Sequence, residues 1–339
     1  MQIRHVKNTS CQSPTRRYNA AMEEKRFIVP ANLDGQRLDR ALAELEPSLT
    51  RSQAAKLAKE GHVSLNGASA KASAAVQTDQ TLTVTMNPPA ASEPEAQDIA
   101  LDILYADEHL LVINKAAGMV VHPAPGNPDG TLVNALLHHV PELREYSIDG
   151  RPGIVHRLDK GTTGTLVVAK THRALIELQR QFAGREVEKI YLALVVGTPK
   201  QKEGRIDLAL GRHVRERKKI SSVTTHGRAA TTLYKVETAH GGISALRCTL
   251  LSGRTHQIRV HCAESGWPLV GDDTYGGVRS LKNIADAPLR LACQALDRPA
   301  LHARRLAFTH PHDGRRLEFF APIPDDLKKI LALIGAENV

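Results

Sequence analysis

The stretch RPGIVHRLDKGTTGTLVVAK, residues 151–170, decides how the chain is organised. Its first half, GIVHRL, has a strand-like pattern and leads into a turn rich in glycine and threonine that carries Asp159. A buried strand resumes at Leu166, as its unbroken apolar run indicates. A carboxylate at the end of a strand, surrounded by backbone donors, is held rigidly enough for nucleophilic or general-base catalysis. Asp159 is therefore a candidate catalytic residue, and the competing interpretation is an aspartate that only caps the turn.

Two later segments supply partners for Asp159. The stretch LLSGRTHQIRVHCAESG, residues 250–266, is predicted to pass from a strand into a helix after Gly253. Arg254 would then begin the helix, where the macrodipole disfavours a cation, so a nearby anion such as Asp159 would stabilise it. In KIYLALVVG, residues 189–197, four apolar side chains alternate on one strand face and leave Tyr191 on the other. The competing interpretations are an arginine in a surface ion pair and an aromatic side chain that covers the sheet.

Strands and helices interleave around these segments over most of the chain. LLVIN at residues 110–114 and TLVVAK at residues 165–170 are predicted strands, and residues 327–334 outline a closing amphipathic helix. This mixture predicts an α+β domain built on a large, mostly antiparallel mixed sheet with flanking helices.

A smaller unit precedes the large one. Residues 38–45 and 51–59 have helical periodicity, and HVSLNG and TLTVTM read as strands of a small α/β module. The Pro- and Ala-rich stretch from Asn87 to Asp98 reads as a linker. We therefore predict a disordered basic tail or misassigned start at 1–22, the module at 23–87, the linker at 88–99, the large domain at 100–328, and a helix end and tail at 329–339.

The overall composition restricts the partners and the compartment. Lys and Arg number 45 against 36 Asp and Glu, a formal net charge of +9, which favours an anionic partner. The four cysteines show no metal-ligand spacing and are expected to be reduced thiols. No apolar run is long enough to span a membrane, and the first residues do not form a secretory signal. We predict a cytoplasmic protein without a membrane partner.

Four motifs resemble those of the RluA family of pseudouridine synthases. HRLDKGTTG at residues 156–164 resembles the family's H-R-L-D-x-x-T-[ST]-G signature. INKAAGMVVHPAPGNPDGTLVNALL at 113–137 resembles the preceding motif, and EKIYLALVVG at 188–197 and LSGRTHQIRVH at 251–261 resemble the two later ones. The unit at residues 33–86 is similar to the RNA-binding module of ribosomal protein S-four. The stretch HPAPGNPDGTLVNALL at 122–137, together with this appended module, looks closest to the family members that modify large-subunit ribosomal RNA.

The resemblance implies the fold of pseudouridine synthases and a function for individual residues. Asp159 would be the catalytic aspartate, Arg254 its ion-pair partner, and Tyr191 the catalytic ring that packs on the flipped base and assists proton removal. Arg157 would enter the RNA stack where the target uridine leaves, and Ile258 would be an apolar neighbour in the base pocket. The reaction cleaves the glycosidic bond and rejoins the base through carbon, so no cofactor and no metal are expected. The expected substrate is structured RNA, namely large-subunit ribosomal RNA or its assembling particle, and the protein is expected to be a monomer.

The sequence departs from the family pattern at three places. Ala116 follows Lys115 where the family usually has proline, Gly161 stands where an acidic residue is common, and Ser252 replaces a threonine. None of these changes touches the proposed chemistry. They bear on which uridine is chosen.

Basic residues outside the motifs are predicted RNA contacts. One group lies on the second helix of the small module: Arg51, Lys56 and Lys59. The other group lies in GRHVRERKKISSVTTHGRA, residues 211–229, which contains six Arg or Lys and one Glu. The predicted contacts in this stretch are Arg215, Arg217, Lys218 and Lys219. A solvated loop is the competing interpretation of this second group.

Three other classes of protein would account for some of these residues. A metal-dependent RNA hydrolase would draw on six side chains of suitable type, although their spacing matches no ligand pattern: His156, Asp159, His256, His261, Asp272 and Asp273. A non-catalytic RNA-binding protein or ribosome assembly factor would use the small module alone. A serine hydrolase is disfavoured because the chain has no G-x-S-x-G elbow.

Overall fold

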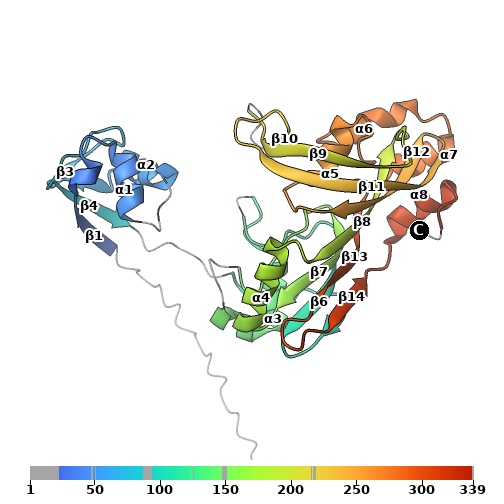
Figure 1. Ribbon diagram of the computed structural model, residues 1–339, viewed down its shortest axis with the longest axis horizontal. Helices are drawn as coiled ribbons and strands as arrows, with labels where there is room; N and C mark the ends of the chain where they lie inside the picture. Colours follow the sequence, from blue (N-terminus) through green and yellow to red (C-terminus); the bar gives the residue numbers. More distant parts are fainter. Residues whose placement is uncertain are drawn as a thin grey trace, which may run out of the picture. The chain divides into compact units, whose positions relative to one another are not determined.

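The computed structural model of the protein describes residues 23–46, 49, 51–86, 94–124, 126–146, 151–214, 216 and 219–337. These residues divide into two compact units, one before residue 93 and one from residue 93 onward (Figure 1). The tail predicted at 1–22 lies outside the described residues. Among the helices that are described, none is both long and apolar enough to cross a membrane.

The small unit is a four-stranded antiparallel sheet with two helices. Its strands lie in the order β1 (Glu23–Ile28), β4 (Thr81–Met86), β2 (Val63–Leu65), β3 (Ala68–Ser69). The helices are α1 (Leu38–Leu45) and α2 (Arg51–Lys59), preceded by a 3-10 turn η1 (Ala31–Leu33). Asn66 and Gly67 form the turn between β2 and β3, with φ of 48° and 81°, the left-handed conformations that a tight hairpin needs. Apolar side chains from both helices and from β2 and β4 form its core.

The large unit is built on one sheet of ten described strands. Along it lie β10 (Ile220–Ser221), β9 (Glu203–Arg212), β11 (Arg228–His240), β12 (Ile243–Leu250), β8 (Glu188–Val196), β13 (Leu301–Thr309), β7 (Thr163–Ala169), β6 (Leu110–Lys115) and β5 (Ile103–Ala106). Strand β14 (Arg316–Phe320) pairs with β13. The β7–β13 pair is parallel, and the other pairs between named strands of this unit are antiparallel. The predicted α+β class with a mostly antiparallel mixed sheet is therefore confirmed.

The parallel pairing of β7 with β13 requires a glycine. Gly164 has a φ of 113°, and a Cβ there would lie 2.3 Å from the carbonyl oxygen of Ala303. Only a residue without a side chain lets the two strands approach this closely. The close approach places the start of β7, directly after the turn that carries Asp159, against the centre of the sheet.

Helices cover both faces of this sheet. Their bounds are α3 (Leu132–His139), η2 (Pro141–Tyr146), α4 (His172–Ala183), α5 (Gln257–Glu264), α6 (Gly277–Ser280), η3 (Leu281–Asn283), α7 (Ala287–Gln294) and α8 (Asp325–Leu333). Helices α3 and α5 pack in one core with Tyr191 and its same-face neighbours on β8. Helices α7 and α8 pack in a second core with Leu192, Leu194 and Val196, which belong to the opposite face of β8. The alternation predicted for this strand is thus confirmed, with both faces buried.

Two predicted boundaries cut through packed structure. In the second half of the predicted linker, the Gln97 amide donates to the carbonyl of Asn134, and the Asn134 side chain donates to the carbonyl of Glu95. Residues 95–97 are therefore docked on α3. At the other end, α8 crosses the boundary predicted at residue 328, and its buried Ile330 and Leu331 belong to the core of the large unit.

Candidate active site

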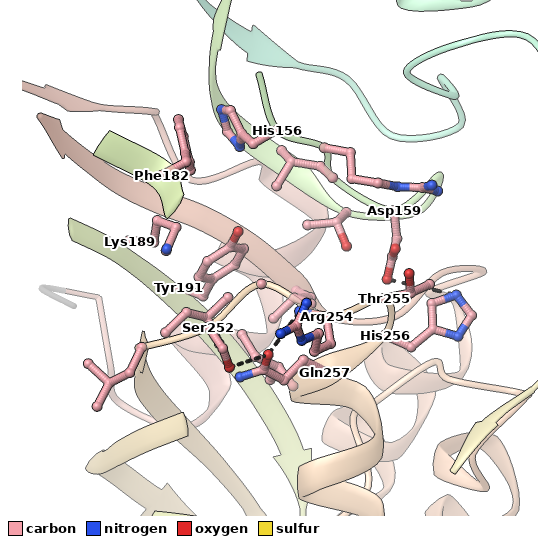
Figure 2. A pocket seen from close by; sticks show the side chains of 18 of the residues that line it. His156, Asp159, Phe182, Lys189, Tyr191, Ser252, Arg254, Thr255, His256 and Gln257 are labelled. Carbon is pink, nitrogen blue, oxygen red and sulfur yellow. Dashed lines mark hydrogen bonds and ion pairs between the residues drawn. The ribbon is translucent and has the colours of Figure 1, made fainter. Parts of the chain in front are cut away.

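A cavity of about 420 Å³ lies in the large unit where three segments meet. Residues 155–159 and Thr162 form one wall, Lys189 and Tyr191 of β8 form another, and residues 250–258 close it from the third side. Figure 2 shows these side chains turned toward one space. The volume is in the range of sites that bind a small molecule or one flipped residue.

The turn that carries Asp159 is held from both sides by buried cations. The ammonium group of Lys115 donates to the carbonyls of Ala116 and Met119, at 2.7 and 2.8 Å, and to that of Lys160 at 3.4 Å. On the other side, Arg298 donates to the carbonyl of Gly161 at 3.2 Å. Burial lowers the pKa of Lys115 to about 8, although the negative charge of Asp159 opposes this shift. These hydrogen bonds from Lys115 and Arg298 therefore fix the backbone of the turn that carries the Asp159 carboxylate.

Arg259, and not Arg254, is the cation that faces Asp159. Its Nη1 lies 3.8 Å from Asp159 Oδ2, and its Nε and Nη2 donate to the two oxygens of Asp272 at 2.7 and 2.9 Å. Burial opposes the charge on Arg259, but the hydrogen bonds to Asp272 and the charges of both aspartates raise its pKa. No ion pair joins Arg254 to Asp159 in the described part of the chain, so the predicted pairing is wrong, although Arg254 lines the cavity.

The error came from where the helix begins. Helix α5 begins at Gln257 and not after Gly253, because His256 before it adopts a left-handed conformation with φ of 55°. The Gln257 side chain accepts hydrogen bonds from the Ser252 hydroxyl and the Arg254 amide, at 2.8 and 3.0 Å, which closes the preceding residues into a loop. The cation on the helical face that reaches Asp159 is therefore five residues further along the chain.

His256 connects Asp159 to a second chain of contacts. Its Nε2 lies 3.9 Å from Asp159 Oδ2 (Figure 2). Its Nδ1 is 2.8 Å from the hydroxyl of Tyr275. That hydroxyl also accepts a hydrogen bond from the Ile220 amide at 2.9 Å. Burial lowers the pKa of His256, and the charge of Asp159 partly opposes this. When the neutral ring accepts a hydrogen bond from the Tyr275 hydroxyl at Nδ1, its own hydrogen is on Nε2 and is directed at Asp159.

Tyr191 and Ile258 lie where the base pocket was predicted. Both line the cavity, Tyr191 is 8% exposed and Ile258 3%, and both belong to one apolar core. Burial, and secondarily the charge of Asp159, raise the pKa of Tyr191. The phenol therefore stays protonated at neutral pH, so it can donate a hydrogen bond but is a poor base.

The predicted RNA contacts are spread over the chain. Arg157 lines the cavity and is exposed. Lys219 pairs with Glu216 at 2.7 Å in the turn before β10, whereas Arg215, Arg217 and Lys218 lie outside the described residues.

On the small unit, the three predicted RNA contacts lie along α2. Arg51 pairs with Asp39 at 3.3 Å and Lys56 with Glu60 at 3.7 Å. Both arginine and lysine remain more than half exposed, and Lys59 is exposed as well. The charge available to a phosphate on this helix is thus partly shared with acidic neighbours.

The six side chains of metal-ligand type do not assemble around one point. His156 accepts a hydrogen bond from the Val167 amide at 3.0 Å and stacks on Phe182 with ring centroids 4.6 Å apart. His261 is fully buried, and Asp272 is bonded to Arg259. Within the ranges that the structure covers, no three His, Cys, Asp or Glu side chains form a group that could hold a metal ion.

Sequence reasoning missed several residues of this site. Arg259 stands in the same motif as Arg254, and its buried partner Asp272 follows thirteen residues later. Lys189 shares the strand face of Tyr191, which its spacing of two already indicated. Tyr275 had no local signal.

Comparisons with known proteins agree with the motifs. A family profile described as RNA pseudouridylate synthase matches residues 109–264, and an S4 domain profile matches residues 36–82. A protein of Pseudomonas aeruginosa named ribosomal large subunit pseudouridine synthase D is 44% identical over 317 residues, covering 94% of this chain and 98% of the relative. A protein of the same name from Nitrosomonas europaea is 44% identical over 309 residues, with 91% and 87% covered.

Solved structures show the same architecture. Human RNA pseudouridylate synthase domain containing 1 superposes with a TM-score of 0.53 at 29% identity, covering 70% of this chain and 89% of that one. Human RNA pseudouridylate synthase domain containing 4 superposes with a TM-score of 0.52 at 23% identity, over 69% and 93% of the two chains, which supports the fold alone. The resemblance predicted from the motifs is confirmed: the chain belongs to the RNA pseudouridylate synthase family and carries an S4 domain before its catalytic unit.

Proposed function

We propose that the uridines this enzyme isomerises lie in large-subunit ribosomal RNA. The support is the name shared by the relatives from Pseudomonas aeruginosa and Nitrosomonas europaea, each 44% identical over more than nine tenths of this chain. The net charge of +9 suits a polyanionic substrate, free or within an assembling particle. The protein acts as a cytoplasmic monomer in this proposal.

The observation that carries the site assignment is the placement of Asp159. It is the one carboxylate among the residues that line the cavity, and the Arg259 guanidinium lies 3.8 Å away. The positive charge stabilises the carboxylate by Coulomb attraction, which in a partly buried site is stronger than in water. Such a group acts either as a nucleophile at the sugar carbon C1′ or as a base toward a sugar proton.

The reaction needs no imported group. The bond from N1 of uracil to C1′ of the ribose breaks, the base rotates, and C5 bonds to C1′. The hydrogen of C5 leaves as a proton, and N1 gains one. Atoms and electrons therefore balance without a redox partner, so this chain has to expose the nucleotide, hold the free uracil and place Asp159.

The other cavity residues share the remaining tasks. The Tyr191 ring packs on the flipped base, and its protonated hydroxyl donates a hydrogen bond. Ile258 supplies the apolar wall beside it. Arg157, exposed at the rim, fills the place that the target uridine leaves in the RNA stack, which offsets part of the few kcal/mol that extrusion costs. Arg254 contributes positive charge toward the RNA and not a pair for Asp159.

Further contacts bind RNA away from the reacting base. In this proposal Arg51, Lys56 and Lys59 of the S4 domain contact phosphates. A second set of contacts follows β9 in the catalytic unit: Arg215, Arg217, Lys218 and Lys219.

Release of tritium from RNA labelled at C5 of uridine tests this function. Transcripts of large-subunit ribosomal RNA are incubated with wild-type protein and with Asp159→Asn, both in EDTA. We expect release by the wild type, at most about one thousandth of that rate from the variant, and RNA binding within a few-fold of the wild type. Loss of binding equal to the loss of rate would make Asp159 structural. No release from any RNA with intact binding would favour a non-catalytic assembly factor.

A further inference from the structure

Lys189 is a buried cation beside the reaction site. It stands two residues before Tyr191 on β8, so both side chains lie on the same strand face and both line the cavity (Figure 2). Lys189 is only 8% exposed, and its ammonium group lies 5.7 Å from the centre of the Phe182 ring. The Phe182 ring in turn stacks on His156. The lysine is thus fixed at one end of the pocket by aromatic packing.

This ammonium group has no anionic partner. In the described part of the chain, no carboxylate lies within ion-pair distance of Lys189 and no acceptor is hydrogen-bonded to its Nζ. The two acids nearest in sequence are used elsewhere: Glu186 pairs with Arg180 and Glu188 with Arg305, each at 2.6 Å. Burial of an unpaired cation is costly, and it lowers the pKa of Lys189.

The side chains that line the cavity carry an excess of positive charge. Arg157, Arg185, Lys189 and Arg254 line it, and Asp159 is the one acid among the lining residues. Arg185 follows the C-cap Gly184 of α4 and has a φ of 62°, the left-handed conformation that ends a helix when the next two amides bond back to Phe182 and Gln181. This helix end places the exposed Arg185 side chain at the cavity.

The spacing suits one nucleotide. Side chains at positions i and i+2 of a strand stand about 6.6 Å apart. If the base lies against Tyr191, then Lys189 reaches the sugar–phosphate part of the same or the next nucleotide. A uracil carbonyl is neutral and would leave the ammonium charge uncompensated, whereas a phosphate carries the full charge that offsets it.

We propose that Lys189, with Arg185 at the rim, forms a binding site for a backbone phosphate next to the target uridine. The site holds the extruded nucleotide by its phosphate while Tyr191 holds its base. It is a substrate-positioning site and takes no part in bond making. The proposal rests on the proposed function, because it requires an RNA substrate in the cavity.

The test compares Lys189→Met with wild type on RNAs that lack one charge each. A hairpin transcript in which the wild type forms pseudouridine is prepared with a single uncharged methylphosphonate at each linkage around the target. We expect one linkage at which the substitution raises the wild-type KM roughly 10- to 100-fold. At that linkage Lys189→Met, whose KM is already raised by a similar factor, should show no further loss, and kcat should change little.

Two further variants keep the result interpretable. Lys189→Arg retains the charge and should remain sensitive to the same linkage, and its thermal unfolding and that of Lys189→Met show whether each folds. Lys329→Met removes an equal charge from the exposed face of α8, on the opposite side of the sheet from the cavity, and should behave as wild type.

A methylphosphonate that raised the KM of wild type and of Lys189→Met by the same factor at every linkage would refute the phosphate site. So would a Lys189→Met enzyme with unchanged KM and reduced kcat, which would place the lysine in the chemistry. Failure of the wild type on all unmodified ribosomal RNA would instead refute the proposed function. The Kd values of the same RNAs, measured in parallel, then decide the phosphate site independently of turnover.

Discussion

The guanidinium of Arg259 lies between two carboxylates, 2.7 Å from Asp272 and 3.8 Å from Asp159. Asp272 is fully buried, so its bidentate hydrogen bonds fix the plane of the guanidinium. The Tyr275 ring covers the same group at 5.0 Å. Arg259 therefore reaches Asp159 in one orientation, with little freedom to turn away.

Arg259→Met should lower both stability and turnover. The substitution leaves Asp272 buried without its partner, which costs about 3–5 kcal/mol of the free energy of unfolding. Adding Asp272→Asn should recover most of that loss but not turnover, because Asp159 still lacks its cation. Urea unfolding and single-turnover rates separate the two effects. The control Arg254→Met should keep a free energy of unfolding within about 0.5 kcal/mol of the wild-type value. If the double variant Arg259→Met with Asp272→Asn regained turnover, Arg259 would be purely structural.

Tyr191→Phe should reduce kcat while RNA still binds. The ring keeps its packing, but the hydroxyl, which burial keeps protonated by raising its pKa, can no longer donate to the base. We expect kcat to fall about 100-fold or more with KM nearly unchanged. Tyr234→Phe is the matched control, since Tyr234 lies on β11 against Trp267 and does not line the cavity. Wild-type kcat in Tyr191→Phe would show that only the ring matters.

Tyr275→Phe should change the pH dependence of turnover. Without the hydroxyl, Nδ1 of His256 loses its hydrogen-bond donor, so protonation of the ring no longer breaks a bond and the pKa of His256 rises. Burial lowers that pKa in the wild type, where Asp159 and Arg259 also face the ring. A protonated His256 would pair with Asp159, 3.9 Å away, and compete with the substrate for that carboxylate. We therefore expect turnover to be lost as the pH falls through this pKa, so the acidic limb moves to higher pH in the variant. Superimposable kcat profiles between pH 5 and 8 would contradict this.

Neutralising the basic segment after β9 should flatten the salt dependence of RNA binding. Changing all four residues to Gln removes four cations: Arg215, Arg217, Lys218 and Lys219. Each phosphate contact contributes about 0.7–0.9 to the slope of log Kd against log salt, so the slope should decrease by about 3. Lys328→Gln with Lys329→Gln on α8 removes two cations from an exposed helix face away from the cavity and should leave the slope unchanged. An unchanged slope would show that this segment is only a solvated loop.

His261→Leu should improve stability at mildly acidic pH. His261 is fully buried, neither ring nitrogen has a hydrogen-bond partner within the described residues, and burial lowers its pKa to about 4. The unfolded chain binds a proton at an ordinary pKa near 6.5, so wild-type stability is lost as the pH falls from there toward 4. The variant should take up about one proton less on unfolding in this window. Equal proton uptake by the two proteins would refute the buried neutral histidine.

Much of the fold and part of the site follow from local patterns. The period of two along residues 189–197 predicted which face of β8 carries Tyr191, because side-chain direction in a strand depends only on the backbone pleat. The strand predicted for GIVHRL is wrong, because residues 155–159 run as extended chain and only Ile154 makes an isolated bridge, to Val168. The turn predicted after it is present, since the Thr162 amide donates to the carbonyl of Asp159 at 3.0 Å. The helices of the small unit and the closing helix were likewise readable from their apolar spacing.

The sequence by itself determined the family, the catalytic turn and the strand face of Tyr191, and the tertiary structure alone decided which arginine serves Asp159. Helix α5 begins where it does because the Gln257 side chain donates to Thr231 and Thr232 on the neighbouring strand β11, at 3.0 Å each. Those bonds join residues about 25 positions apart, so the local sequence pattern near Arg254 does not predict them. The left-handed conformation of His256 before the helix has no local sequence signal either. The same long-range packing brings Asp272 and Tyr275 to Arg259 and His256, because burial of charge selects partners by position in space and not by distance along the chain.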